Sequence, residues 1–314
     1  MSDLTRQQSQ PRSSPHGTKQ SIAVKSAILL CILAMGIVFA LSAFIGWRLT
    51  HPERRPVDVT PAAWGLAYET VSFTSRIDKL PLQGWVVPAH DSRLTVIAAH
   101  GYGRNRLQDD VPLLPIVQAL INQGCNVVLF DFRNSGESAG TMTSIGQYEI
   151  RDLLGAVDFA RTRPELNKPI VLYGFSMGAA TALVAGAQEP AVAGVIADSP
   201  FADLDSYLSE NLSVWSHLPA IPFNAAILSV TPLVTGLDTA QVSPLKAITN
   251  FNNRPVLLIH GEADTDIPLA NSELLQARYP AADLLRIPGA VHVGSFRQDS
   301  AAYLTGVSRF LEQL

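Results

Sequence analysis

The chain has 314 residues, which is enough for one large domain or two small ones with ample apolar core. Hydrophobic residues make up 47% of the chain and charged residues 16%, a composition too apolar for a disordered chain and slightly apolar for a wholly soluble one. The net charge of −4 argues against a nucleic-acid partner, and Cys31 and Cys125 are too few for a disulfide framework or a structural zinc site.

The first 47 residues divide into a polar and an apolar segment. Residues 1–25 are rich in Ser, Gln and Pro and show no apolar periodicity, which predicts a disordered polar tail. No residue from Ser26 to Trp47 carries a charge, and about 20 apolar residues are enough for a helix to cross a bilayer. We therefore expect a single transmembrane helix at 26–47. The alternative is a cleaved signal peptide, since Ala40-Leu-Ser42 resembles a cleavage site.

The charges beside this span predict its orientation. Basic residues are slightly more numerous before the span than in the about 20 residues after it, and cytoplasmic flanks carry the excess. They are Arg6, Arg12, Lys19 and Lys25 before it, and Arg48, Arg54 and Arg55 after it. This predicts a cytoplasmic N-terminus and a domain on the non-cytoplasmic side. Residues 48–68 hold prolines among charges, which indicates a linker.

The segment 69–314 alternates short apolar runs with helical patterns, which predicts βαβ units. Runs of Val, Ile and Leu are typical of strands covered by helices on both faces of a mostly parallel sheet. The expected strands are a hairpin at 70–74 and 82–87, then 94–99, 126–130, 170–173, 194–197, 255–259 and 283–287. The expected helices are 111–123, 145–161, 177–188, 269–278 and 295–314.

One region interrupts this alternation. More than 50 residues separate Ala197 from Pro255, and they contain prolines and helical apolar spacing. A structureless loop of that length is rare in a compact domain. We expect a short helical cap at about 203–245, over the edge of the sheet where ligands bind.

The motif Gly174-Phe-Ser-Met-Gly178 lies directly between an expected strand and an expected helix. A turn this sharp requires small residues on both sides of its central residue and exposes the Ser176 hydroxyl at the edge of the sheet. The following helix directs its amides and the positive end of its dipole at the same point. Ser176 is therefore the candidate nucleophile.

A serine nucleophile needs a base and a group that orients the base. Among the histidines after Ser176, His292 lies in a loop just past the last expected strand, where a base must be. We expect His217 to be a solvated cap residue and His260, at the end of a buried strand, to be structural. Asp264 is the preferred acid because its loop follows a strand and precedes His292.

Two other carboxylates remain candidates for the acid. Asp266 lies beside Asp264, and one of this pair is expected to cap a helix. Asp198 also follows a strand and satisfies the same geometry.

The remaining groups of an acyl-transfer site are amides that bind an oxyanion. The Met177 amide is one candidate, and the loop His100-Gly-Tyr-Gly103 offers the Tyr102 amide as the other. Asp131 and Arg133 follow the next strand, and we expect them to stabilise its loop through Glu149 or Asp152.

Five ordered blocks of residues carry a resemblance to a known family. They are His-Gly-x-Gly at His100, Asp-x-Arg-x-x-Gly-x-Ser at Asp131, Gly-x-Ser-x-Gly at Ser176, His-Gly-x-x-Asp-x-x-Ile-Pro at His260, and the late His292. The chain resembles a serine hydrolase of the α/β-hydrolase fold over about 70–314. Within that superfamily it is most similar to a membrane-anchored, short-cap branch that includes protein depalmitoylases and bacterial esterases. The resemblance implies the roles given above to Ser176, Asp264 and His292.

These features predict a membrane-anchored hydrolase that cleaves an ester or thioester, or an amide, through an acyl-enzyme. The expected substrate is a small-molecule or lipid-like acyl compound, with no cofactor, metal or nucleic acid. Two alternatives stay open: an acyltransferase using the same triad, and a catalytically silent, membrane-anchored binding protein of the same fold.

Overall fold

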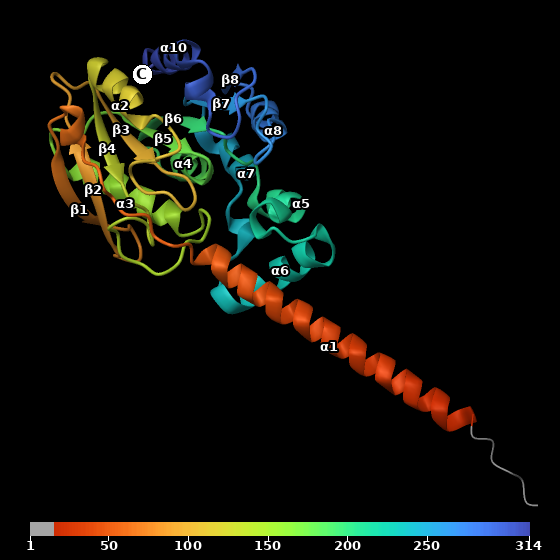
Figure 1. The fold of residues 1–314 in the computed structure, drawn as a ribbon. Helices are drawn as coiled ribbons and strands as arrows, with labels where there is room; N and C mark the ends of the chain where they lie inside the picture. Colours follow the sequence, from red (N-terminus) through yellow and green to blue (C-terminus); the bar gives the residue numbers. More distant parts are fainter. Residues whose placement is uncertain (1–15) are drawn as a thin grey trace, which may run out of the picture.

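The computed structural model describes residues 16–314 and contains one large sheet with helices on both faces (Figure 1). The eight strands are ordered β1-β2-β4-β3-β5-β6-β7-β8. β2 runs antiparallel to β1 and β4, and the remaining neighbours are parallel. The strands are β1 (Glu69–Thr74), β2 (Pro81–Val87), β3 (Leu94–Ala99), β4 (Cys125–Phe130), β5 (Ile170–Phe175), β6 (Val192–Asp198), β7 (Val256–Gly261) and β8 (Asp283–Ile287). The mostly parallel α/β architecture predicted from the sequence is confirmed.

The central strands are covered on both sides because their side chains alternate between two apolar cores. One core contains Ile97, Val128 and Leu172, and the other contains Val96 and Val127. The first core is covered by α3 (Glu149–Thr162), α4 (Met177–Gln188), α7 (Pro244–Ala247) and α8 (Ala270–Arg278). The second is covered by α2 (Leu113–Asn122), α9 (Ser295–Gln298) and α10 (Ser300–Leu311).

The C-terminal helix differs from the expected continuous helix over 295–314. It breaks at Asp299, whose side chain accepts a hydrogen bond from the Ala302 amide and so begins α10. An aspartate satisfies a free amide at a helix start better than it fits a helix interior, which explains the break.

The helix α1 (His16–Thr50) is longer than the predicted span. Residues 16–25 belong to it, so the prediction of a disordered tail is wrong for this part, and residues 1–15 lie outside the described residues. The segment Ile22–Thr50, 29 residues long, is apolar enough to cross a membrane. Figure 1 shows most of α1 projecting from the domain, with only its C-terminal end against it.

The segment expected to be a linker at 48–68 packs against the domain. The Arg54 guanidinium donates to the Ser138 carbonyl at 2.6 Å, and Asn105 donates to the Pro56 carbonyl at 2.8 Å. Pro61 is buried in a short 3₁₀ helix (Pro61–Trp64), and Leu66 packs on one of the apolar cores. Composition indicated a free linker because prolines lack amide donors, but their carbonyls and the flanking arginines find partners here.

The cap consists mainly of α5 (Leu204–Ser216) and α6 (Ala220–Thr235), followed by a 3₁₀ turn (Thr239–Gln241). A third apolar cluster joins these helices to the domain through Phe201 and Ile267. Ile45 and Leu49 of α1 pack on the same cluster. The cap is thus held between the sheet and the end of α1 (Figure 1).

Candidate active site

Ser176 occupies a strained turn between β5 and α4. Its φ of 54° and ψ of −119° lie outside the favoured regions for a residue with a side chain. A Cβ at Gly174 would lie 2.2 Å from the Gly178 carbonyl oxygen, and a Cβ at Gly178 would lie 2.1 Å from the Ala99 oxygen. Glycine is therefore required at both positions. The Ser176 amide donates to the Asp198 carbonyl at 2.8 Å, which holds the turn against β6.

The structure brings Ser176, His292 and Asp264 into one chain of hydrogen bonds. His292 Nε2 lies 2.9 Å from Ser176 Oγ, and His292 Nδ1 lies 2.7 Å from Asp264 Oδ2. Because a carboxylate only accepts, Nδ1 carries the proton and Nε2 is free to accept from the serine hydroxyl. The arrangement leaves an imidazole poised to take the Ser176 proton.

Asp264 is fixed by more than its bond to the imidazole. Its second oxygen, Oδ1, accepts from the amides of Asp266 at 3.0 Å and Ile267 at 2.8 Å. Burial opposes its charge, but hydrogen bonds from His260 and His292 outweigh burial and lower the pKa of Asp264 to about 2. Burial likewise opposes the charged form of His292, yet the Asp264 carboxylate raises the pKa of His292 above its usual value.

The other candidate acids and bases have different partners. Asp198 accepts from the Tyr303 hydroxyl at 2.8 Å and from the Ser199 hydroxyl at 3.0 Å, and complete burial raises the pKa of Asp198 to about 6. His260 is fully buried, with its ring nitrogens bonded to the Ile267 carbonyl and the Ser272 hydroxyl. His217 is exposed at the end of α5. None of these side chains is bonded to Ser176 or His292.

Two amides beside Ser176 are available to an oxyanion. The amides of Met177 and Tyr102 donate no hydrogen bond to any group within residues 16–314. The Tyr102 loop is held by His100, whose Nδ1 donates to the Gly101 carbonyl at 2.8 Å and whose Nε2 accepts from the Phe132 amide at 3.0 Å. Burial lowers the pKa of His100, which favours this neutral state.

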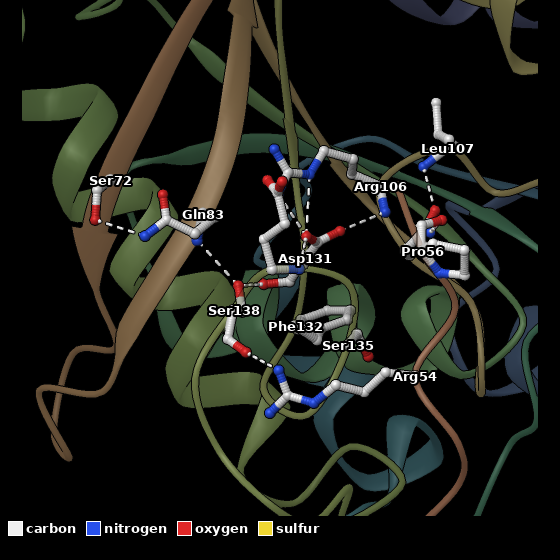
Figure 2. A network of polar contacts seen from close by, with 12 residues as sticks. Arg54, Pro56, Ser72, Gln83, Arg106, Leu107, Asp131, Phe132, Ser135 and Ser138 are labelled. Carbon is white, nitrogen blue, oxygen red and sulfur yellow. Dashed lines mark hydrogen bonds and ion pairs between the residues drawn. The ribbon is translucent and has the colours of Figure 1, made fainter. Parts of the chain in front are cut away.

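The charged loop after β4 is bonded to Arg106, which follows the Tyr102 loop in the chain (Figure 2). Asp131 accepts from the Arg106 Nη2 at 2.6 Å and from the Arg106 amide at 2.7 Å, and both side chains are fully buried. Arg133 pairs with Asp152 at 2.7 Å, one of its two expected partners. Arg106 was not foreseen, because nothing in its local sequence distinguishes it from a surface arginine.

A pocket opens beside Ser176, Met177 and Tyr102. Its far side is formed by apolar cap residues, among them Leu212 of α5 and Ile227 of α6. Gly46, Leu49 and Thr50 of α1 also line it. This contribution could not be predicted from the sequence, since the end of an apolar span and a distant cap share no motif. Within the described residues no group of His, Cys, Asp or Glu side chains is arranged to hold a metal ion.

Comparisons with known proteins identify relatives of this chain. The family described as serine aminopeptidase, S33, matches residues 90–235. The uncharacterized protein YfhR of Escherichia coli strain K12 is 32% identical over 75% of this chain and 76% of its own length. The chain belongs to the α/β-hydrolase family. The chain is also similar to the uncharacterized protein YqkD of Bacillus subtilis, at 29% identity over 94% of this chain and 98% of YqkD.

Among solved structures, the esterase Pf2001 of Pyrococcus furiosus superposes with a TM-score of 0.69 at 27% identity, over 84% of this chain and 98% of that one. The esterase Est1E of Butyrivibrio proteoclasticus shares the fold, with a TM-score of 0.56 and 16% identity over 78% of this chain and 98% of that one. The family and the likeness to the esterase Pf2001 support a hydrolase, whereas the likeness to Est1E shows the fold alone.

Proposed function

We propose that this hydrolase is a membrane-anchored serine esterase or thioesterase that works through an acyl-enzyme. The observation that carries the proposal is the chain of hydrogen bonds from Ser176 through His292 to Asp264, beside two unengaged amides. The fold supports acyl chemistry, since the strained turn presents one nucleophile at the sheet edge. The similarity of this chain to the esterase Pf2001 supports an ester as the substrate.

In the first half-reaction Ser176 Oγ attacks the acyl carbon while His292 Nε2 takes the hydroxyl proton. The carbonyl π electrons move to oxygen, and the Met177 and Tyr102 amides donate to this oxyanion, each contributing about 3 to 4 kcal/mol. Collapse breaks the bond to the leaving oxygen or sulfur, and His292 returns its proton to that atom. Water then repeats these steps on the acyl-enzyme, with His292 as base and then acid, and releases the carboxylic acid.

A fluorophosphonate probe tests the nucleophile. The full-length protein should be labelled, and Ser176→Ala should not be labelled although it folds normally. Ser295→Ala is the matched control, because Ser295 is also a buried serine, its hydroxyl bonds to no group within residues 16–314, and its loss should leave labelling intact. Equal labelling of wild type and Ser176→Ala would reject Ser176, and no labelling of the wild type would favour the silent binding protein.

The anchor is part of the same proposal. The apolar stretch of α1 is long enough to span a bilayer, and the excess of basic residues before it favours a domain on the non-cytoplasmic side. A reporter that is active only after export, fused after Leu314, should be active. A silent export reporter together with an active cytoplasmic reporter would reverse the orientation, and release of α1 by proteolytic processing would identify it as a signal peptide.

A further inference from the structure

The pocket wall offers almost no polar group to a ligand. Within residues 16–314 no charged side chain lines it, and the hydroxyl groups other than Ser176 already donate to protein oxygens. Thr50 donates to the Trp47 carbonyl, Tyr102 to the Leu49 carbonyl, Tyr207 to the Asp266 carbonyl, Thr231 to the Ile227 carbonyl and Thr239 to the Asp205 carboxylate. A ligand that fills this pocket must be apolar away from its scissile group, because polar groups buried there would lose their hydrogen bonds to water.

A second, polar cavity adjoins this apolar pocket. It is lined by Glu53, Arg54, Arg55 and Arg104, and it shares only Tyr102 and Trp215 with the first pocket. The rings of Tyr102 and Trp215 meet edge to face with centroids 5.9 Å apart. The site thus has an apolar and a polar compartment with aromatic rings between them, which fits an amphipathic molecule.

The apolar compartment depends on close packing between α1 and α6. Ser42, Gly46 and Thr50 are buried at four-residue spacing on α1, the spacing of one helix face. A Cβ at Gly46 would lie 2.1 Å from Thr231 Oγ1 of α6, so only glycine allows this approach. In contrast, a Cβ at Gly36, farther along α1, would meet nothing.

The length of α1 places this contact at the surface of a membrane. The 29 residues of Ile22–Thr50 extend further than the about 20 residues, or about 30 Å, that a hydrocarbon core requires. The uncharged run from Ser26 to Trp47 can fill that core, so the turns from Ser42 to Thr50, which pack on the cap, lie at the end of the run, where the helix leaves the hydrocarbon. On α6, two and three residues beyond the Thr231 that meets Gly46, Leu233 is 78% exposed and Val234 is 49% exposed.

On this basis we propose that the site takes long-chain acyl esters that reside in a bilayer, with the end of α1 and α6 forming the wall that receives the acyl chain. This proposal rests on the proposed function, because it assigns the substrate class of the Ser176 site. The ester lies at Ser176, its acyl chain contacts Gly46 and Leu49, and α6 sits in the membrane interface. The helix that anchors the protein is therefore also part of its substrate pocket.

Substitutions on α1 test the acyl wall. The full-length protein is reconstituted in phosphatidylcholine vesicles, and kcat/KM is measured on p-nitrophenyl acetate and p-nitrophenyl decanoate. Gly46→Leu should lower the decanoate-to-acetate ratio at least tenfold by filling the wall, whereas Gly36→Leu, the same change on the same helix, should keep the wild-type ratio. Equal ratios for wild type, Gly46→Leu and Gly36→Leu would overturn the proposal.

A second variant tests the acyl wall even if the Gly46→Leu protein misfolds because α1 separates from the cap. Leu49→Ala removes bulk from the same wall without a clash, so the preferred acyl chain should lengthen in a series of p-nitrophenyl esters. An unchanged chain-length profile in Leu49→Ala would overturn the proposal. Fluorophosphonate labelling of Ser176 in each variant separates the two levels: a labelled enzyme with no chain-length response contradicts only the acyl wall, while an unlabelled wild type contradicts the serine hydrolase itself.

The membrane contact of α6 is tested separately with an environment-sensitive fluorophore. Cys31→Ser removes the exposed cysteine, and Leu233→Cys or Leu274→Cys then introduces one labelling site. Leu274 is the matched control, because it is a leucine 53% exposed on α8. In the vesicles a nitrobenzoxadiazole label should shift to the blue at position 233 and not at position 274. Identical emission at both positions would place α6 in water and overturn this part of the proposal.

Discussion

On the sheet side of the active site, Ser176, His292 and Asp264 are positioned by hydrogen bonds of 2.7 to 3.0 Å, whereas on the opposite side α1, α5 and α6 meet mainly through apolar contacts. Directional bonds fix atoms within tenths of an ångström, as proton transfer requires. Apolar contacts are non-directional, so they shape a pocket without fixing any one atom. In the proposed function, the first side therefore carries out the reaction, and the second selects which acyl groups reach it.

The largest effect should come from breaking the hydrogen-bonded side at Asp264. Asp264→Asn keeps the side-chain volume but removes the charge and the preference for a proton on His292 Nδ1, so kcat should fall by about 10⁴. The measurement is kcat on p-nitrophenyl acetate, a substrate too short to depend on the apolar wall.

Asp198→Asn is the control for that substitution, since Asp198 is buried nearby but bonds to Tyr303 and Ser199. It should lower kcat far less than Asp264→Asn. If Asp198→Asn has the larger effect on kcat, the orienting acid lies on β6 and the assignment of Asp264 is wrong.

The next largest effect should be a loss of stability when the buried ion pair between Arg106 and Asp131 is broken. Arg106→Met leaves the Asp131 carboxylate buried without its cation, which should lower the free energy of unfolding by about 3 to 5 kcal/mol. Chemical denaturation in a mild detergent measures this change. Arg163→Met is the control: it removes the partially exposed ion pair with Glu69 and should cost about 1 kcal/mol or less. Equal losses would show that the Arg106 pair is no more important than a surface pair.

The two sides also differ in how far the sequence predicts them. The sheet, the turn at Ser176 and the placement of His292 and Asp264 in one cluster followed from local patterns, because a sharp turn and parallel strands constrain nearby residues strongly. The contact of Gly46 with Thr231 joins positions far apart in the chain. It depends on complementary shape, which leaves no periodicity or motif. For the same reason the packing of residues 48–68 and the partner of Asp131 were not predicted.

Truncation of α1 separates its anchoring role from its pocket role. Removing residues 1–41 keeps the turns from Ser42 to Thr50, so the domain should be active on both acetate and decanoate esters. Removing residues 1–50 deletes Gly46, Leu49 and Thr50 from the wall. The decanoate-to-acetate ratio should then fall about tenfold or more, because lost apolar contacts to a chain are worth about 1 to 3 kcal/mol. Identical ratios for the two truncations would mean that α1 contributes nothing to the pocket.

The smallest expected effect is a shift in the pH dependence of kcat/KM. It should arise only from changes to the hydrogen-bonded side of the site. His292 must be neutral to accept the Ser176 proton, so kcat/KM falls as the pH drops through the pKa of His292. Because Asp264 raises that pKa, the acid limb in the wild type should lie above the ordinary histidine value of about 6.5. Asp264→Asn removes the stabilising charge, and its residual activity should have an acid limb at lower pH.

Leu49→Ala changes the apolar wall without touching His292 and should keep the wild-type limb. A limb that moves in Leu49→Ala and stays fixed in Asp264→Asn would mean that burial by the cap, and not the Asp264 carboxylate, controls the protonation of the base.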